Sequence, residues 1–339
     1  MTRTVTADQA LAERHEAEVN ADGKRDVKYA FAFKNLDWEA YHRFRPVYPE
    51  SMWKQWFDYH RSHGGKFETA HDAGSGPGTA ATVIGQHFQQ VFVSDAGASN
   101  LATAEATLTP REKFTFHQGP AEKTAEWLPP ASVDFTSICM AFHYMDSAAT
   151  VRAVAQTLKP GGTFAAATYG FRLLFPGQPR AEELWYKATS RETLRLMREG
   201  KLFPAAVRGL ARAMTGLDFV AFPSDLFEKG VRRVYVNVSE NEKRPLYFVD
   251  NEPGLWEEAQ TFVAPTDVYE YIQDATWGRQ ADAAWLRGFL ASSQMGFDDT
   301  TWTLDEWKEL EAIVGSGPNG TIAVEWPVAI TLATRKADA

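Results

Sequence analysis

The stretch HDAGSGPGTAATVIG, residues 71–85, decides the fold that we predict for this chain. Asp72 ends a predicted strand, and Gly74, Gly76 and Gly78 follow it before an Ala-rich segment of helix length. Glycine lets a backbone approach a ligand closely, and the first turn of a helix has free N–H groups. The arrangement of strand, glycine loop and helix therefore predicts a ligand site at the end of a parallel strand.

On both sides of this loop, strand-like runs alternate with segments of helix length. The runs are FETAHD (67–72), QVFVSD (90–95), FTFHQG (114–119), SVDFTSICMAF (132–142) and GTFAAATYG (162–170). The segments 79–89 and 98–108 are Ala-rich and long enough for crossover helices. This alternation predicts a doubly wound α/β fold with a mostly parallel sheet, and it assigns residues 67–170 to the core.

Three further regions surround this core. Residues 1–66 are polar at first, with Thr6 and Gln9 at capping-box spacing, and then aromatic, which predicts a helical and aromatic N-terminal arm. Residues 171–318 read mostly as helices, with a strand candidate at 232–238, and predict a cap. Residues 319–339 contain a β-branched run, 321–335, which we expect to return to the sheet edge. Pro327 lacks an N–H donor, so we expect a bulge or an edge position there.

The composition is that of a globular protein, with 339 residues, 44% hydrophobic and 23% charged. The formal net charge of −9 and the lack of a basic stripe argue against a nucleic-acid partner, so a small molecule is the default. No apolar run is long enough for a signal peptide or a membrane span, and we expect a cytoplasmic protein without a membrane partner. The sequence does not define the oligomeric state.

Metal sites and internal disulfides are not expected. Cys139 is the single cysteine of the chain, so it can form neither an internal disulfide nor a thiolate zinc site. His60 and His63 have no third ligand nearby in the sequence. We therefore predict no metal.

The glycine spacing and a second acidic residue indicate the kind of cofactor. The dinucleotide fingerprint is G-x-G-x-x-G, whereas this chain has D-x-G-x-G-x-G, which suits a cationic amino-acid group better than a pyrophosphate. Asp95 ends the second predicted strand about 20 residues further on, where a carboxylate can accept hydrogen bonds from a ribose diol. Together these features predict a nucleoside cofactor.

The chain resembles the class I S-adenosylmethionine-dependent methyltransferases, which are Rossmann-like, and is similar to the trans-aconitate methyltransferase type and its fungal small-molecule relatives. The matching elements are YHRFRPVYP (41–49), DAGSGPGT (72–79), GPAEKT (119–124), SVDFTSICMAFHYMD (132–146) and LKPGGT (158–163). The resemblance implies S-adenosylmethionine as cofactor. The cofactor-binding residues that it implies are Tyr41, Asp72, Gly74, Gly76, Gly78, Asp95, Ala121 and Glu122.

The resemblance also implies the role of each part of this set. The glycine loop would hold the methionine part of the cofactor, with Asp72 orienting its ammonium group. Asp95 would hold the ribose, and Ala121 with Glu122 would border the adenine.

Two residues are candidates for catalysis or acceptor binding. His143, near the end of the fourth predicted strand, is a candidate base or orienting group, and the alternative is a structural histidine paired with Asp146. Arg45, with Arg43, is a candidate ligand for an anionic acceptor because a guanidinium fork matches a carboxylate. In the alternative, Arg45 attaches the N-terminal arm to the sheet.

The function predicted from these features is methyl transfer to a small molecule, with a carboxylate oxygen of an acidic, trans-aconitate-like metabolite as the favoured acceptor. Transfer to a phenol or a thiol of a secondary metabolite is the first alternative. A nicotinamide-dependent oxidoreductase and a non-catalytic cofactor-binding protein are alternatives from other classes.

Overall fold

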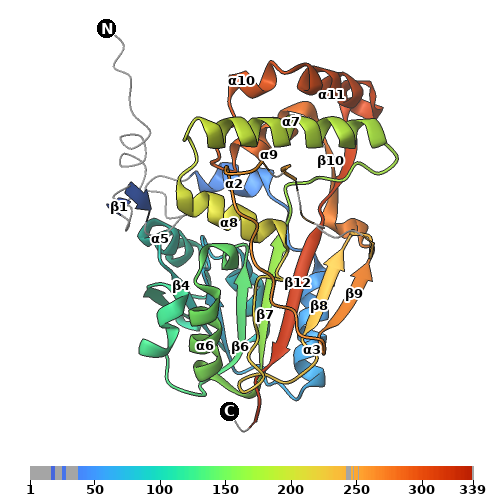
Figure 1. Cartoon of the computed structure of the whole chain (residues 1–339). Coiled ribbons are helices and arrows are strands. Elements are labelled where there is room, and N and C mark those ends of the chain that lie inside the picture. The colour runs from blue at the N-terminus through green and yellow to red at the C-terminus, as the bar shows by residue number, and fades with distance from the viewer. Residues whose placement is uncertain are drawn as a thin grey trace.

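An eight-stranded sheet forms the centre of the computed structural model, which describes residues 17–19, 25–27, 37–241, 246, 248–250 and 252–337 (Figure 1). Its strand order is β5-β4-β3-β6-β7-β12-β8-β9. The strands are β3 (Thr69–Ala73), β4 (Gln90–Asp95), β5 (Phe114–Gln118), β6 (Val133–Cys139), β7 (Leu158–Tyr169), β8 (Arg232–Val236), β9 (Val268–Ile272) and β12 (Val328–Thr334). All pairings are parallel except the two that β12 makes with β7 and β8.

Helices cover both faces of this sheet and its upper end. The α-helices are α2 (Trp38–Phe44), α3 (Glu50–Ser62), α4 (Thr79–His87), α5 (Ala98–Thr107), α6 (Ser147–Thr157), α7 (Pro179–Arg198), α8 (Pro204–Met214), α9 (Ala283–Ala291), α10 (Asp299–Trp302) and α11 (Asp305–Ser316). The 3-10 helices are η1 (Arg111–Lys113), η2 (Ala121–Glu126), η3 (Phe142–Tyr144), η4 (Ala275–Trp277) and η5 (Pro318–Gly320). Two small antiparallel ladders pair β1 (Ala17–Val19) with β2 (Arg25–Val27), and β10 (Gly278–Ala281) with β11 (Ile322–Glu325).

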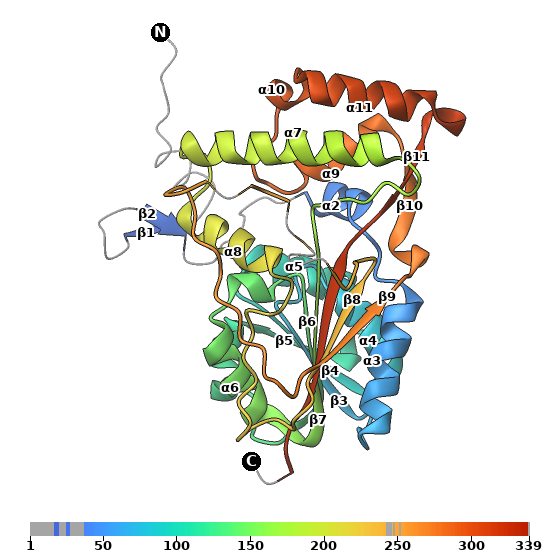
Figure 2. The ribbon, with the colours of Figure 1, turned by 45° about the vertical axis from the view of Figure 1, so that its right-hand side comes forward.

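The core is formed where α3 and α6 pack on opposite faces of the sheet (Figure 2). On one face, Trp56 and Phe57 of α3 lie about 6 Å from the ring of Phe135 in β6, at 6.1 and 5.9 Å between centroids. On the other face, Val151 and Val154 of α6 are fully buried in a second apolar cluster. Because both faces are covered, nearly all residues of the central strands β3, β6 and β12 are buried, including polar ones.

The predicted doubly wound α/β fold is confirmed. Strand β4 has the predicted bounds, 90–95, and α4 and α5 occupy the segments predicted as crossover helices. The capping-box residues Thr6 and Gln9 lie outside the described residues. The strand candidate at 232–238 is present as β8 and joins the main sheet, as does β9, so the range 171–318 supplies sheet strands as well as helices.

The predicted edge position of the run 321–335 is wrong. This run forms two strands, β11 and β12, and β12 lies inside the sheet between β7 and β8 with all of its residues buried. The reason is the place of Pro327, which falls between the two strands. Its missing N–H therefore removes no ladder hydrogen bond, and its carbonyl accepts one from Gly170 at 2.8 Å.

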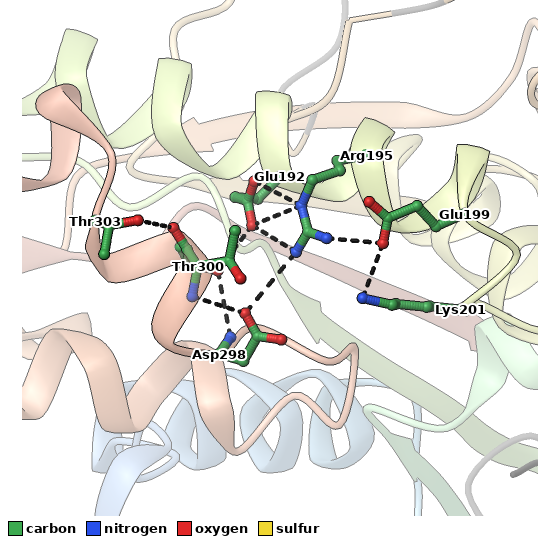
Figure 3. A network of polar contacts seen from close by, with 8 residues as sticks. Glu192, Arg195, Glu199, Lys201, Asp298, Thr300 and Thr303 are labelled. Carbon is green, nitrogen blue, oxygen red and sulfur yellow. Dashed lines mark hydrogen bonds and ion pairs between the residues drawn. The ribbon is translucent and has the colours of Figure 1, made fainter. Parts of the chain in front are cut away.

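The helical layer above the sheet is fastened by a polar network between α7 and α10 (Figure 3). Glu192 is 1% exposed and accepts hydrogen bonds from Arg195 at 2.9 Å and from the hydroxyl of Thr301 at 2.9 Å. Arg195 also donates to Glu199 at 2.8 Å. A buried carboxylate is tolerated only with such partners, so the network fixes α10 and the segment before it against α7.

Candidate active site

A cavity lies at the carboxyl ends of β3, β4, β5 and β6, beneath the helical layer. This is where parallel α/β sheets bind ligands, because loops from neighbouring strands separate there. The cavity brings together nine of the eleven candidate site residues predicted from the sequence, which are Tyr41, Arg45, Asp72, Gly74, Gly76, Asp95, Ala121, Glu122 and His143.

The glycine loop has the backbone shape that its sequence predicts. Gly74 and Gly76 have φ angles of 69° and 55°, which side-chain-bearing residues rarely adopt. A Cβ on Gly74 would lie 2.7 Å from the Cβ of Ala141 and 2.7 Å from the Cε of Met145. Gly78 does not line the cavity; it begins α4 with a φ of 89° and packs against α5, so its requirement is conformational.

Asp72 presents a buried carboxylate to this cavity. Its Oδ1 accepts a hydrogen bond from the Ser137 hydroxyl at 2.8 Å, whereas its Oδ2 has no hydrogen-bond partner. Burial raises the pKa of Asp72 to about 7. A buried carboxylate oxygen without a partner is costly, and a bound cation would offset this cost.

Asp95 is held by three hydrogen bonds at the end of β4. Its Oδ1 accepts from the backbone N–H of Gly97 at 2.7 Å and from Nδ2 of Asn100 at 3.0 Å, and its Oδ2 accepts from the N–H of Gly76 at 2.9 Å. These hydrogen bonds lower the pKa of Asp95, but burial has the larger effect and raises it above its ordinary value. Asn100 also lines the cavity, and the sequence analysis did not identify it because its segment showed only the pattern of a crossover helix.

Ala121 and Glu122 belong to the element GPAEKT (119–124). They lie in η2, directly after β5. Glu122 accepts a hydrogen bond from the backbone N–H of Asp146 at 2.7 Å, which ties η2 to the start of α6. The carboxylate of Asp146 itself caps α6 by accepting from the N–H of Ala149 at 3.0 Å. Among the described residues, no hydrogen bond or ion pair joins Asp146 to His143, whose Nδ1 has no partner.

His143 lies in η3, a short distance beyond the end of β6, and is 5% exposed. Its Nδ1 has no hydrogen-bond partner. Burial, together with the positive charge of Arg212, lowers the pKa of His143 to about 3. The side chain is therefore a neutral imidazole near pH 7 and a weak base.

Arg45 follows α2 and projects a buried guanidinium into a group of aromatic rings. Its Cζ lies 4.8 Å from the ring centroid of Tyr41, 5.0 Å from that of Phe171 and 5.4 Å from that of Phe289. The residue is 6% exposed, its Nε has no hydrogen-bond partner, its guanidinium is hydrogen-bonded to the side chain of Tyr169, and it forms no ion pair with any carboxylate among the described residues. Arg43, the other predicted arginine, is exposed and does not line the cavity.

The cavity is also lined by residues that were not among the candidate site residues. Tyr48 and Tyr169 line the cavity, and burial raises the pKa of each well above its ordinary value, so both are neutral phenols. Met140 has a φ of 54° and its sulfur accepts from the N–H of Tyr169 at 3.1 Å. The part of the cavity under the helical layer is apolar and is lined by Leu202, Phe203, Leu210, Leu246, Phe248 and Met295.

The described residues offer neither a metal-binding cluster nor a membrane-spanning helix. That part of the chain contains no group of three His, Cys, Asp or Glu side chains arranged to hold a metal ion. Within the same residues, none of the helices is long and apolar enough to cross a membrane.

Comparison with known proteins identifies the family. A family model described as a methyltransferase domain matches residues 71–166. A methyltransferase of Claviceps purpurea is 31% identical over 90% of this chain and 93% of the relative. The methyltransferase tpcM of Aspergillus fumigatus is 29% identical, again over 90% of this chain and 93% of the relative. The chain belongs to the class I S-adenosylmethionine-dependent methyltransferases.

The fold comparison agrees with this assignment. A solved structure described as a candidate type II methyltransferase from Anaeromyxobacter dehalogenans aligns with a TM-score of 0.52 and 20% identity, over 85% of this methyltransferase and 97% of the other chain. The predicted family and enzyme class are thus confirmed, in preference to the nicotinamide oxidoreductase.

The residues of this methyltransferase fit the cofactor that the family implies. The Oδ2 of Asp72 is an unused buried acceptor beside the glycine loop, and Gly74 and Gly76, which line the cavity, present backbone without a side chain there. Asp95 stands on the neighbouring strand, on the same cavity.

Proposed function

We propose that this methyltransferase transfers the methyl group of S-adenosylmethionine to a carboxylate oxygen of a small acid with an apolar body. The single observation that carries the proposal is the buried guanidinium of Arg45, which lies among aromatic side chains and forms no ion pair with a carboxylate among the described residues. A buried cation of this kind is costly until an anion pairs with it, and an acceptor carboxylate would be that anion.

In this proposal the cofactor extends across the polar half of the cavity. Asp72 and the glycine loop bind its amino-acid part, Asp95 binds the ribose, and Ala121 with Glu122 borders the adenine. S-adenosylmethionine supplies an electrophilic methyl group on a sulfonium sulfur. The protein then has to hold the nucleophilic oxygen in line with that methyl group and exclude water.

The weak basicity of His143 favours an acceptor that is already ionised. A carboxylate needs no proton removed before attack, whereas a phenol does, and an imidazole with a pKa of about 3 is a poor base for a phenol. We assign His143 the role of a neutral hydrogen-bonding group that orients the acceptor. Tyr48 and Tyr169, whose pKa values are raised by burial, stay protonated and line the same space in this account.

The lining also favours an acid with one negative charge. Among the described residues that line the cavity, Arg45 is the one arginine or lysine, and the wall under the helical layer is apolar. A trans-aconitate-like acid would leave two carboxylates without a cationic partner there, at a large desolvation cost. A monocarboxylic acid with an apolar body would bury its hydrocarbon part against this wall.

The test is a transfer assay with S-adenosylmethionine carrying a tritiated methyl group. The acceptor panel contains monocarboxylic acids of increasing apolar size, a trans-aconitate-like tricarboxylic acid, phenols and thiols. A methyl ester releases volatile labelled methanol in mild base, whereas methyl ethers and thioethers are stable to it. We expect base-labile products from the apolar monocarboxylic acids. Base-stable products would show that a phenol or a thiol is the acceptor.

A further inference from the structure

The carboxylate of Asp95 has little hydrogen-bonding capacity left for a ligand. Its Oδ1 already accepts from Gly97 and from Asn100, and its Oδ2 accepts from Gly76. A carboxylate has about four acceptor positions in all. One position therefore remains, on Oδ2, whereas a ribose diol presents two hydroxyl donors.

The neighbouring Asn100 has an unused acceptor. Its side chain is 3% exposed and lines the cavity, and its Oδ1 has no hydrogen-bond partner. The amide orientation is determined by chemistry, because only the NH2 group can donate to the carboxylate of Asp95 at 3.0 Å. The carbonyl oxygen must then be the free end, and a buried carbonyl without a donor is unfavourable until one binds.

Gly97 keeps this pair of side chains in place. A Cβ at position 97 would lie 2.8 Å from Nδ2 of Asn100 and 3.1 Å from Oδ1 of Asp95. Any larger residue would thus push Asn100 away from the carboxylate. Asp95 and Asn100 thus place two hydrogen-bond acceptors side by side at the end of β4, and Gly97 leaves room for them.

We propose that the Oδ1 of Asn100 accepts the second ribose hydroxyl of the cofactor, so that the diol is divided between Asp95 and Asn100. This inference rests on the proposed position of the cofactor in the cavity. Each hydroxyl then has an acceptor of its own, and Asn100 is a binding residue for one of them. Its second role is to orient Asp95.

The test is calorimetric binding of S-adenosylhomocysteine and three analogues that lack the 2′-hydroxyl, the 3′-hydroxyl or the adenine amino group. The proteins are the wild type, Asn100→Ala and, as a matched control on the same helix, Thr103→Ala, which removes a hydroxyl that bonds only to Ser99. We expect Asn100→Ala to weaken S-adenosylhomocysteine about tenfold. It should leave unchanged the affinity for the deoxy analogue that lacks the hydroxyl bound by Asn100. Thr103→Ala should leave the affinity for S-adenosylhomocysteine and for both deoxy analogues unchanged.

Two results would overturn the inference. In the first, Asn100→Ala weakens the parent compound and both deoxy analogues by the same factor. In the second, Asn100→Ala does not weaken binding of the analogue without the adenine amino group, which would show that Asn100 contacts the adenine and not the ribose. If Asn100→Ala does not fold, a wild-type crystal structure with S-adenosylhomocysteine decides: a ribose oxygen within about 3.2 Å of Asn100 Oδ1 supports the inference. Both hydroxyls on Asp95 contradict it.

Failure of the proposed function gives a different result from failure of this inference. A wild-type protein that does not bind S-adenosylhomocysteine at all contradicts the proposed cofactor site, and the inference about Asn100 with it. A protein that binds the compound but shows no role for Asn100 contradicts the inference alone.

Discussion

The backbone N–H of Gly76 donates a hydrogen bond of 2.9 Å to Oδ2 of Asp95, which joins the loop after β3 to the end of β4. The two sequence features that indicated a nucleoside cofactor are therefore parts of one unit. This contact holds the two parts of the proposed cofactor site in position relative to each other. Such preorganisation reduces the entropy that binding has to offset.

Asp95→Asn should weaken binding of S-adenosylhomocysteine by at least about tenfold. The new NH2 group would meet donors from Gly76, Gly97 or Asn100, and charge-assisted hydrogen bonds are stronger than the neutral ones that would replace them. Titration calorimetry measures the effect. Asp58→Asn, at an exposed carboxylate, is the control and should bind normally. Normal binding by a folded Asp95→Asn protein would remove Asp95 from the site.

Asp72 should make cofactor affinity depend on pH near neutrality. Its pKa is raised to about 7, so the ionised form that attracts an ammonium group increases as the pH rises through 7. Affinity for S-adenosylhomocysteine should rise about tenfold between pH 6 and pH 8 in the wild type. In Asp72→Asn the profile should be flat and the affinity low, as calorimetry at several pH values would show.

Ionisation of Asp72 should raise cofactor affinity but lower the stability of the folded protein. The folded-state pKa of about 7 lies above the ordinary value of 3.8, so between these values the folded protein holds a proton that the unfolded chain has lost. This residue's contribution to the free energy of unfolding therefore falls as pH rises from about 4 to 7 and is level above 7. Urea unfolding of the wild type and Asp72→Asn should differ most at pH 8, where the variant is the more stable. If the wild type and Asp72→Asn had the same free energy of unfolding at pH 8, the claim that the ionised Asp72 is destabilised by burial would be wrong.

Arg45→Lys should raise the KM for an acidic acceptor about tenfold, because an ammonium group cannot match a carboxylate with two parallel hydrogen bonds. Affinity for S-adenosylhomocysteine should not change. Arg43→Lys is the matched control on the same segment, since Arg43 is exposed and away from the cavity. An unchanged KM in Arg45→Lys would favour the structural alternative, in which Arg45 only attaches the arm.

His143→Gln should lower kcat several-fold and leave the affinity for S-adenosylhomocysteine unchanged, because the residue faces the acceptor in our account. With a pKa of about 3, His143 should contribute no titration to kcat between pH 5 and pH 8. Steady-state kinetics across this range measures both quantities. A wild-type profile that titrates near 6.5 and loses that titration in the variant would instead show a general base, whereas unchanged turnover would leave His143 without a catalytic role.

The sequence predicted those features that depend on local pattern. The strands, the glycine loop and Asp95 were found because alternation, glycine spacing and strand ends are visible along the chain. The interior position of β12 was not, because the rule against proline in central strands applies only within a strand, and Pro327 falls between two. Asn100 and Tyr169 were not predicted as site residues for another reason. They reach the cavity through contacts with residues distant in sequence, and a periodic pattern does not reveal such contacts.

A crystal structure with S-adenosylhomocysteine bound is the measurement that tests the central claim most directly. We predict that the ribose contacts Asp95, that the amino group lies at the Asp72 end of the glycine loop, and that the sulfur faces the space between Arg45 and His143. A nucleoside bound elsewhere, or a sulfur turned away from Arg45, would contradict the account.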